Sequence, residues 1–325
     1  MMKLKRYRRL LVVAVLLIVL LVAAISMNDL TTSKSEDRKQ VSLIVYGDDP
    51  ERWENLRQGA GLVCEQKKAG LSLLTMFSEN DVGEQEEIID REIASGADAL
   101  IIAACNSVEI RDYINAKDPD IPVVFVEDVE SFYEKKSLCI TPDDYQMGYD
   151  LGEELVKNES DIVTVAVVSE SVQRDSIALR EKGLLDAIEG KVGKVIMWSR
   201  DENSSRINKR QFIQKALVSE ATDVIVTFDS FTTDALIDAL ANLNTKSKVY
   251  AISTSDKALY NLYSKEIIAL GFPDEYAMGY LAAMNALDRP YAKKKYSSKR
   301  AEYKIVRKEN MYDEENQTLL FPFVN

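Results

Sequence analysis

Strand-like apolar runs alternate with amphipathic helical stretches from residue 40 onward, and this alternation restricts the possible folds more than any other feature of the chain. The apolar runs are centred near residues 43, 74, 101 and 125, and then near 165, 196, 225 and 251. They carry apolar residues at consecutive positions, as strands covered by helices on both faces do. The pattern predicts parallel α/β layers. Because the spacing recurs, we expect two βαβ units in tandem, each with its own core.

The predicted elements are as follows. Strands are expected at 41–46, 71–77, 99–103, 123–127, 162–168, 194–198, 223–227 and 248–253. Helices are expected at 52–68, 84–95, 108–116, 145–157, 176–189, 208–219, 232–240 and 275–287. A connecting segment, 131–144, contains a short strand-like run at 138–141.

The first 28 residues are expected to act as an export segment. An unbroken apolar run at 10–25 follows five basic residues, which resist translocation, so the rest of the chain should lie outside the cytoplasm. The run is slightly shorter than the roughly 20 residues of a full span. Ala24 and Ser26 offer a weak cleavage site, and no cysteine follows for lipid attachment. A single-pass membrane anchor is the preferred prediction, and cleavage to a secreted or periplasmic form is the alternative. Residues 29–39 are predicted to be a polar linker.

Composition excludes several classes of function. Beyond residue 30 the chain carries 36 basic and 52 acidic side chains, a formal charge of −16, which disfavours nucleic-acid binding. The absence of histidine excludes histidine triads and histidine metal ligands. Cys64, Cys105 and Cys139 are scattered in apolar segments, and burial is the expected role of each. No glycine-rich phosphate loop follows any predicted strand. We therefore predict no catalytic residue, no metal site and no cofactor, and we do not expect an enzyme.

Six segments resemble those of one known family in their order and spacing. They are VSLIVYGDDPERWENLRQGAGLVCEQ, EEIIDREIASGADALIIAACNS, IPVVFVED, TPDDYQMGYDLGEEL, REKGLLDAI and GFPDEYAMGYLAA. Residues 40–310 thus resemble the type I periplasmic binding proteins, the ribose- and galactose-type sugar binders that are related to the ligand domain of sugar-responsive repressors. The resemblance implies two Rossmann-like lobes with parallel sheets joined by a three-strand hinge. It divides the chain into a first lobe of 40–141 plus 272–300 and a second lobe of 142–271 plus 301–325.

The residues that follow the predicted strands are the expected ligand site, because open parallel sheets bind ligands at the carboxyl ends of their strands. The resemblance places Trp53 where the family has a sugar-stacking aromatic, and Glu127 where it has a cleft acid. Several positions depart from the ribose-type pattern: Asp128 replaces an arginine, Ala178 replaces another, Phe228 replaces an asparagine, Thr254 replaces an aspartate and Gly271 replaces a glutamine. The predicted ligand-binding residues are Asp49, Trp53, Asn106, Glu127, Asp128, Arg174, Phe228, Asp229 and Thr254.

Each of these residues also has a purely structural interpretation. Trp53 and Phe228 can pack in a core, Glu127 can form a salt bridge, and Arg174 can lie exposed on the surface. If Asp48, Asp49 and Asp128 converge, their negative potential favours an amine-bearing ligand over a neutral sugar.

Two functions are compatible with these features. The leading prediction is an extracytoplasmic solute-binding protein that closes its cleft on a small polar, carbohydrate-like ligand and serves an ABC importer or a membrane sensor. The alternative is a membrane-anchored signalling protein with a diverged cleft that contacts a sensor histidine kinase. The export segment stands where sugar-responsive repressors have their DNA-binding helices, which argues against a repressor.

Overall fold

A computed structural model describes residues 38–127, 137–159, 162–169, 173–199, 208–241, 243, 246–288 and 299–321. Residues 40–325 form one compact unit. The predicted export segment at 10–25 and the candidate ligand residue Asp128 lie outside the described residues. Within the described ranges, no helix has the length and apolar character needed to cross a membrane.

The first lobe is a six-stranded parallel sheet in the order β11-β5-β4-β3-β1-β2. Its strands are β1 (Gln40–Val45), β2 (Gly70–Thr75), β3 (Ala99–Ala103), β4 (Val123–Val126), β5 (Ser137–Thr141) and β11 (Lys299–Arg300). Its helices are η1 (Glu51–Trp53), α2 (Glu54–Gln66), α3 (Val82–Ala94), α4 (Ser107–Lys117) and α10 (Glu275–Asp288). In the register of the sheet, Leu43 lies between Leu73 and Ile101. Strands β1, β3 and β4 are almost wholly apolar and buried, as their consecutive apolar residues predict.

The second lobe repeats the arrangement in the order β12-β10-β9-β8-β6-β7. Its strands are β6 (Thr164–Val168), β7 (Lys194–Trp198), β8 (Val224–Thr227), β9 (Lys248–Ile252), β10 (Ile267–Pro273) and β12 (Tyr303–Val306). All neighbours are parallel except β10 and β12, which pair antiparallel. Its helices are α5 (Asp144–Asn158), α6 (Asp175–Ile188), α7 (Lys209–Ser219), α8 (Ser230–Leu240), α9 (Asp256–Ser264) and α11 (Glu314–Leu320).

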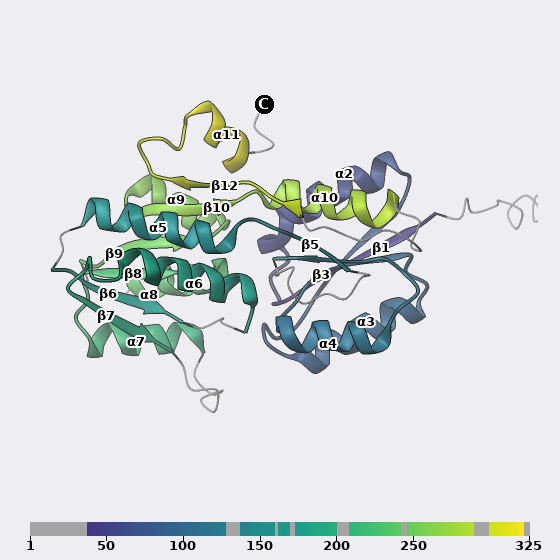
Figure 1. The fold of residues 1–325 in the computed structure, drawn as a ribbon, viewed down its shortest axis with the longest axis horizontal. Coiled ribbons are helices and arrows are strands. Elements are labelled where there is room, and N and C mark those ends of the chain that lie inside the picture. The colour runs from purple at the N-terminus through teal and green to yellow at the C-terminus, as the bar shows by residue number, and fades with distance from the viewer. Residues whose placement is uncertain are drawn as a thin grey trace, which may run out of the picture. The chain divides into compact units, whose positions relative to one another are not determined.

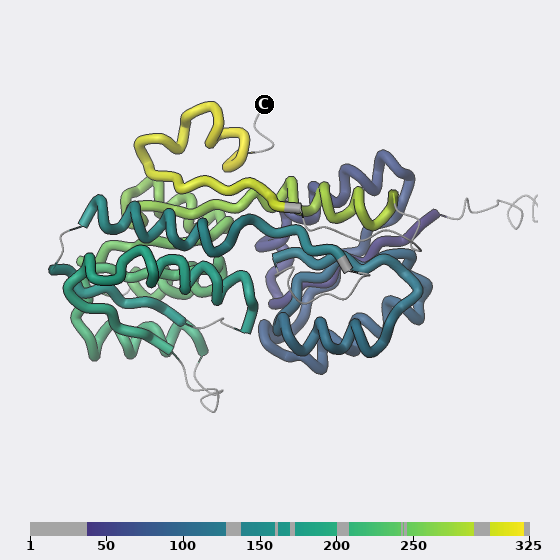
Figure 2. The backbone as a smooth tube through the Cα atoms, in the orientation of Figure 1, coloured from purple at the N-terminus to yellow at the C-terminus, as the bar shows by residue number. Residues whose placement is uncertain are grey.

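The chain passes between the lobes three times (Figures 1 and 2). Strand β5 belongs to the first sheet and leads into α5, β10 belongs to the second sheet and leads into α10, and β11 and β12 belong to different sheets. Helix α10 returns to the first lobe, where it packs against α2. Asp144 and Glu275 are the first residues of α5 and α10, so both lie directly beside a crossing. These crossings form the three-strand hinge that the resemblance implied.

Two glycines bring α5 and α6 into close contact and thereby position part of the site. A Cβ atom on Gly148 would lie 1.9 Å from the carbonyl oxygen of Arg180, and one on Gly183 would lie 2.0 Å from that of Tyr145. No larger residue fits at either position while the helices remain this close. This close packing of α5 against α6 therefore sets the distance between Asp144 at the start of α5 and Arg180 on α6.

The prediction of two parallel α/β lobes is confirmed, and every predicted strand and helix is present with small shifts at its ends. The sequence analysis did not predict β10, β11, β12, α9 and α11. Strand β11 has only two residues, and β12 is a partly exposed strand at the edge of its sheet, so neither has a strong apolar pattern. The three cysteines are buried, as expected from their apolar surroundings.

Candidate functional site

Charged residues from both lobes meet beside the hinge and form a buried network. We call Arg52, Glu127 and Glu275 of the first lobe, with Asp144 and Arg180 of the second, the hinge-side cluster. Arg52 donates from Nη1 to Oε1 of Glu275 at 2.7 Å, and its Nη2 lies 3.3 Å from Oε1 of Glu127. Arg180 donates from Nε to Oδ1 of Asp144 at 2.7 Å, and its Nη2 lies 3.9 Å from the same Glu127 oxygen. Glu127 thus lies between two guanidinium groups, one from each lobe.

The backbone at Glu127 directs its carboxylate into this network. Glu127 follows β4 with a φ of 55°, a left-handed conformation that is uncommon for a residue with a side chain and often marks a functional position. Tyr46, which follows β1, donates its hydroxyl to Oε2 of Glu127 at 2.8 Å. Burial acts to raise the pKa of Glu127, but Arg52 and Arg180 outweigh it and hold the pKa below its ordinary value. Glu127 therefore stays ionised at neutral pH.

The other two acids of the cluster behave differently from Glu127. Burial raises the pKa of Glu275 to about 7, even though Arg52 opposes the rise. Its Oε2 has no hydrogen-bond partner among the described residues. Burial also raises the pKa of Asp144, against the opposing charge of Arg180. Glu275 consequently gains and loses its proton near neutral pH.

A second set of charges lies where the lobes meet away from the crossings. We call Arg174, Lys209 and Asp229 of the second lobe, with Glu79 of the first, the rim group. Lys209 donates to Oε2 of Glu79 at 2.8 Å across the lobe boundary. The Asp229 carboxylate accepts from the backbone N–H and the hydroxyl of Thr232. Burial opposes ionisation of Asp229, but Lys209 and Arg174 hold its pKa well below the ordinary value.

The Arg174 side chain is buried but donates no hydrogen bond to any described residue. Its side chain is 1% exposed, and its Nη2 lies 3.7 Å from Oδ2 of Asp229, beyond hydrogen-bonding distance. The guanidinium carbon lies 4.1 Å from the centre of the Tyr46 ring in the first lobe. None of its three nitrogens has a hydrogen-bond partner among the described residues. Buried donors without partners are rare in folded proteins and indicate a missing acceptor.

The aromatic residues at the boundary are covered by their neighbours. Trp53 is fully buried and donates its Nε1–H to the carbonyl of Tyr46 at 3.1 Å. The Arg52 guanidinium lies 4.4 Å from the centre of its ring, and the Tyr46 ring meets it edge-on at 4.8 Å. Phe228 lies in the core of the second lobe. Phe231 of α8 instead reaches the first lobe, where the centre of its ring lies 5.9 Å from that of Tyr46. Gly47 lies beneath this ring, and a Cβ atom there would be 2.5 Å from Cζ of Phe231, so only a glycine fits.

A pocket of about 510 Å³ opens between the lobes, and Arg52 is one of the residues that line it. We call it the interlobe pocket. It contains two of the predicted ligand residues, Asp49 and Thr254. From the first lobe it is lined by Asp49, Glu51, Arg52, Glu54, Asn55 and Gln58. From the second lobe and the crossing it is lined by Asp234, Thr254, Ser255, Asp256, Lys257, Leu259, Phe272, Leu320 and Phe321.

The predicted site residues therefore separate into groups. Glu127 belongs to the hinge-side cluster and Arg174 and Asp229 to the rim group, while Trp53 lies against Arg52. Asn106 caps α4, accepting from the N–H groups of Val108 and Glu109. Their roles in ligand binding stay predictions.

Sequence reasoning missed Tyr46, Arg52, Phe231 and Glu275. Tyr46 is the last residue of the predicted strand at 41–46, and Arg52 precedes the predicted ligand residue Trp53, so their positions were the signal that could have found them.

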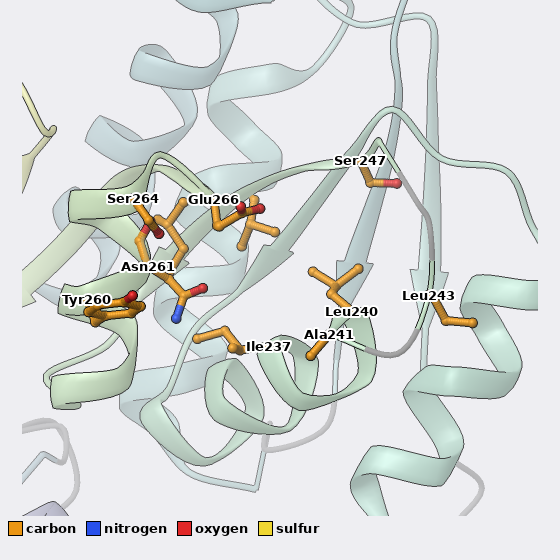
Figure 3. Close-up of a pocket in the computed structure, with 11 residues that line it drawn as sticks. Ile237, Leu240, Ala241, Leu243, Ser247, Tyr260, Asn261, Ser264 and Glu266 are labelled. Atoms are coloured by element: carbon orange, nitrogen blue, oxygen red, sulfur yellow. The ribbon is translucent and has the colours of Figure 1, made fainter.

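A second pocket, of about 440 Å³, lies wholly within the second lobe (Figure 3). It is bounded by Ile237 and Leu240 of α8 and by Tyr260 and Asn261 of α9. None of the predicted site residues lines it.

The fold and the position of the charged network between the lobes define a two-lobed binding protein. The chain belongs to the periplasmic binding protein family, whose domain description, "Periplasmic binding protein domain", matches residues 41–293. Members of this family bind solutes and are not enzymes, and the domain implies an extracytoplasmic location. No curated protein sequence shows a significant match to this chain.

Several solved structures share the fold. A glucose-galactose binding protein, GanP, from Geobacillus stearothermophilus is 18% identical, with a TM-score of 0.72 over 85% of this chain and 100% of that one. An ABC transporter solute-binding protein from Agrobacterium vitis with bound D-fucose is 17% identical, with a TM-score of 0.76 over 87% and 100%. XylFII in its complex with LytSN is 16% identical, with a TM-score of 0.72 over 84% and 98%.

Proposed function

We propose that this protein is an extracytoplasmic binding protein for a small, carbohydrate-like solute, and that its lobes close on the solute between the hinge-side cluster and the rim group. The observation that carries the proposal is the buried Arg174 guanidinium, whose nitrogens have no hydrogen-bond partner among the described residues. Sugar hydroxyl oxygens supply the acceptors that it lacks. Two structures of the same fold are described as binding glucose and galactose or D-fucose, which supports a solute of this class.

Closure follows from where the donors lie. Arg174 belongs to the second lobe and stacks on Tyr46 of the first, so a solute that bonds to Arg174 also lies against the first lobe. Such a solute contacts both lobes only when they are together and therefore favours the closed state. An ABC importer or a membrane sensor would then recognise that state.

The proposal is tested on the purified full chain by a thermal-shift screen of neutral sugars and sugar acids, followed by calorimetry on any solute that raises the melting temperature. Arg174→Met should weaken binding about tenfold or more, because a hydrogen bond to a charged group contributes roughly 1.5–3 kcal/mol. Arg210→Met removes the same charge from an exposed position on α7 and should bind normally. A panel without any hit, or unchanged binding by Arg174→Met, would refute the proposal.

A second function is favoured by a different observation. The acid expected to face a solute, Glu127, is already bonded to Tyr46 and Arg52 and lies 3.9 Å from Arg180 of the other lobe, so its carboxylate has partners without any solute. A structure of the same fold is a complex with another protein, LytSN. The chain would then be a signalling protein that presents a closed surface to a sensor histidine kinase. Small-angle scattering distinguishes the two functions: a radius of gyration unchanged at solute saturation supports signalling.

We also propose that residues 10–25 keep the chain at the outer face of the cytoplasmic membrane as a single-pass anchor. The proposal rests on the apolar run and its basic flank. N-terminal sequencing of the mature protein tests it, and a start near Met27 would show cleavage instead.

A further inference from the structure

The interlobe pocket has an excess of negative charge that the protein does not neutralise. Among its lining residues, Asp49, Glu51, Asp234 and Asp256 form no ion pair with any described residue. The two cations in the lining are already paired: Arg52 binds Glu275 and Glu127, and Lys257 binds Asp238 at 3.0 Å. A fifth acid, Glu54, is paired with Arg57. Four carboxylates thus face one pocket with no partner cation.

Asp234 is the carboxylate whose position most calls for a ligand. It is half-buried, and its carboxylate accepts a hydrogen bond from the Ser255 hydroxyl at 2.6 Å. Burial raises the pKa of Asp234, and the positive charges of Lys257 and Arg52 offset only part of this rise. A cation bound beside Asp234 would compensate for the hydration energy that the carboxylate loses on burial.

A second and independent observation points to acceptor oxygens on the same ligand. Arg52 lines the pocket with a side chain that is 6% exposed, and its Nε has no hydrogen-bond partner among the described residues. A buried donor of this kind calls for an oxygen acceptor within reach. Leu259 and Phe272 add apolar surface, against which the carbon frame of a ligand can pack.

The lining disfavours a metal ion as the occupant. In the described parts of the chain, no three acidic, cysteine or histidine side chains converge as metal ligands must. A protonated amine needs no such convergence, because its donors can bond to carboxylates on different sides of a pocket. We propose that the interlobe pocket binds an amino sugar, with its ammonium group between Asp234 and Asp256 and its hydroxyl oxygens toward Arg52 and Thr254.

Arg52 connects this pocket to the hinge-side cluster, because its side chain lines the pocket while its guanidinium bonds to Glu275 and Glu127. Residues of both lobes line it, so its occupancy stabilises the present arrangement of the lobes. A ligand there would therefore promote closure from outside the cleft.

The test is calorimetry of the full chain with D-glucosamine, D-glucose and 1,4-diaminobutane. D-Glucosamine should bind, and D-glucose, which lacks the amine, should bind at least tenfold more weakly. Added salt should weaken D-glucosamine binding, because the carboxylates are partly exposed and screened. Preferential binding of the diamine, or no binding of D-glucosamine, would overturn the proposal.

A matched pair of variants assigns the binding to this pocket. Asp234→Asn with Asp256→Asn should weaken D-glucosamine binding about tenfold or more. Glu65→Gln with Glu87→Gln removes two exposed carboxylates from α2 and α3, outside the pocket lining, and should bind as wild type does. Arg174→Met should also retain D-glucosamine binding, which separates this proposal from that for the sugar cleft. Loss of binding in Arg174→Met but not in the Asp234 and Asp256 variant would place the amine in the cleft and overturn the assignment.

Discussion

The hinge-side cluster and the rim group are both made of arginines and carboxylates at the same lobe boundary, yet they differ in how completely their charges are paired. Arg180 bonds to Asp144 and to the carbonyl oxygen of Phe228 and lies near Glu127. Arg174 is equally buried, but its closest carboxylate oxygen, on Asp229, is 3.7 Å away. The distinction teaches that the bonds of the first region fix its arginines within their own lobes, whereas the Arg174 guanidinium of the second offers donors that a solute can use.

The difference has a local cause. Asp144 and Glu275 begin helices directly beside two crossings, so the hinge itself places their carboxylates next to the arginines. Rim-group residues come from loops and helix starts that the hinge does not constrain. A solute that binds at the rim can therefore displace weak contacts without breaking the bonds beside the hinge.

The largest expected effect comes from removing the best-paired arginine. Arg180→Met leaves Asp144 buried without its cation, and breaking a buried ion pair in this way costs about 3–5 kcal/mol of unfolding free energy. Chemical denaturation of the full chain measures the change, with Arg210→Met as the exposed control. If the two variants are equally stable, the Arg180–Asp144 pair does not stabilise the fold and the comparison fails.

A smaller effect concerns pH and the acid that Arg52 binds. The folded protein raises the pKa of Glu275 to about 7 from an ordinary value of 4.5, so the folded state binds this proton more tightly than the unfolded state. The resulting stability is fully present below about pH 4.5 and is lost as the pH rises through about 7. Glu275→Gln cannot ionise, so wild type should lose about 1–3 kcal/mol relative to this variant between pH 4.5 and 8.

Urea denaturation of both proteins across this pH range measures the difference in slope. Parallel curves would mean that Glu275 is ionised throughout the range, and the cluster would then hold both of its first-lobe acids as anions.

The fold could be predicted from the sequence far better than the site. Consecutive apolar residues in β1, β3 and β4 mark strands covered on both faces, and this signal is local to each strand. The site depends on which side chains meet across the boundary, and no local pattern encodes that meeting. Glu127 was predicted at the end of a strand and Trp53 at the start of a helix, and the structure has Glu127 directly after β4 and Trp53 directly before α2. The sequence did not show that Arg52 would bond to Glu127 and lie over Trp53. Similarly, Phe228 was predicted to be a ligand-binding aromatic, and the structure places it in the core of the second lobe, whereas Phe231 contacts Tyr46 of the first lobe.

The smallest expected effect is at the rim. Lys209 and Glu79 join the lobes at 2.8 Å, but their side chains are 12% and 27% exposed, so water and salt screen the pair more than the hinge-side bonds. Lys209→Met and Glu79→Gln, with the double variant, form a cycle that isolates their interaction. We expect a coupling energy of about 0.2–1 kcal/mol, as for exposed pairs, that decreases in high salt. A coupling above about 2 kcal/mol would show that the Lys209–Glu79 pair contributes substantially to holding the lobes together. In that case a solute would have to break the Lys209–Glu79 pair before it could reach Arg174.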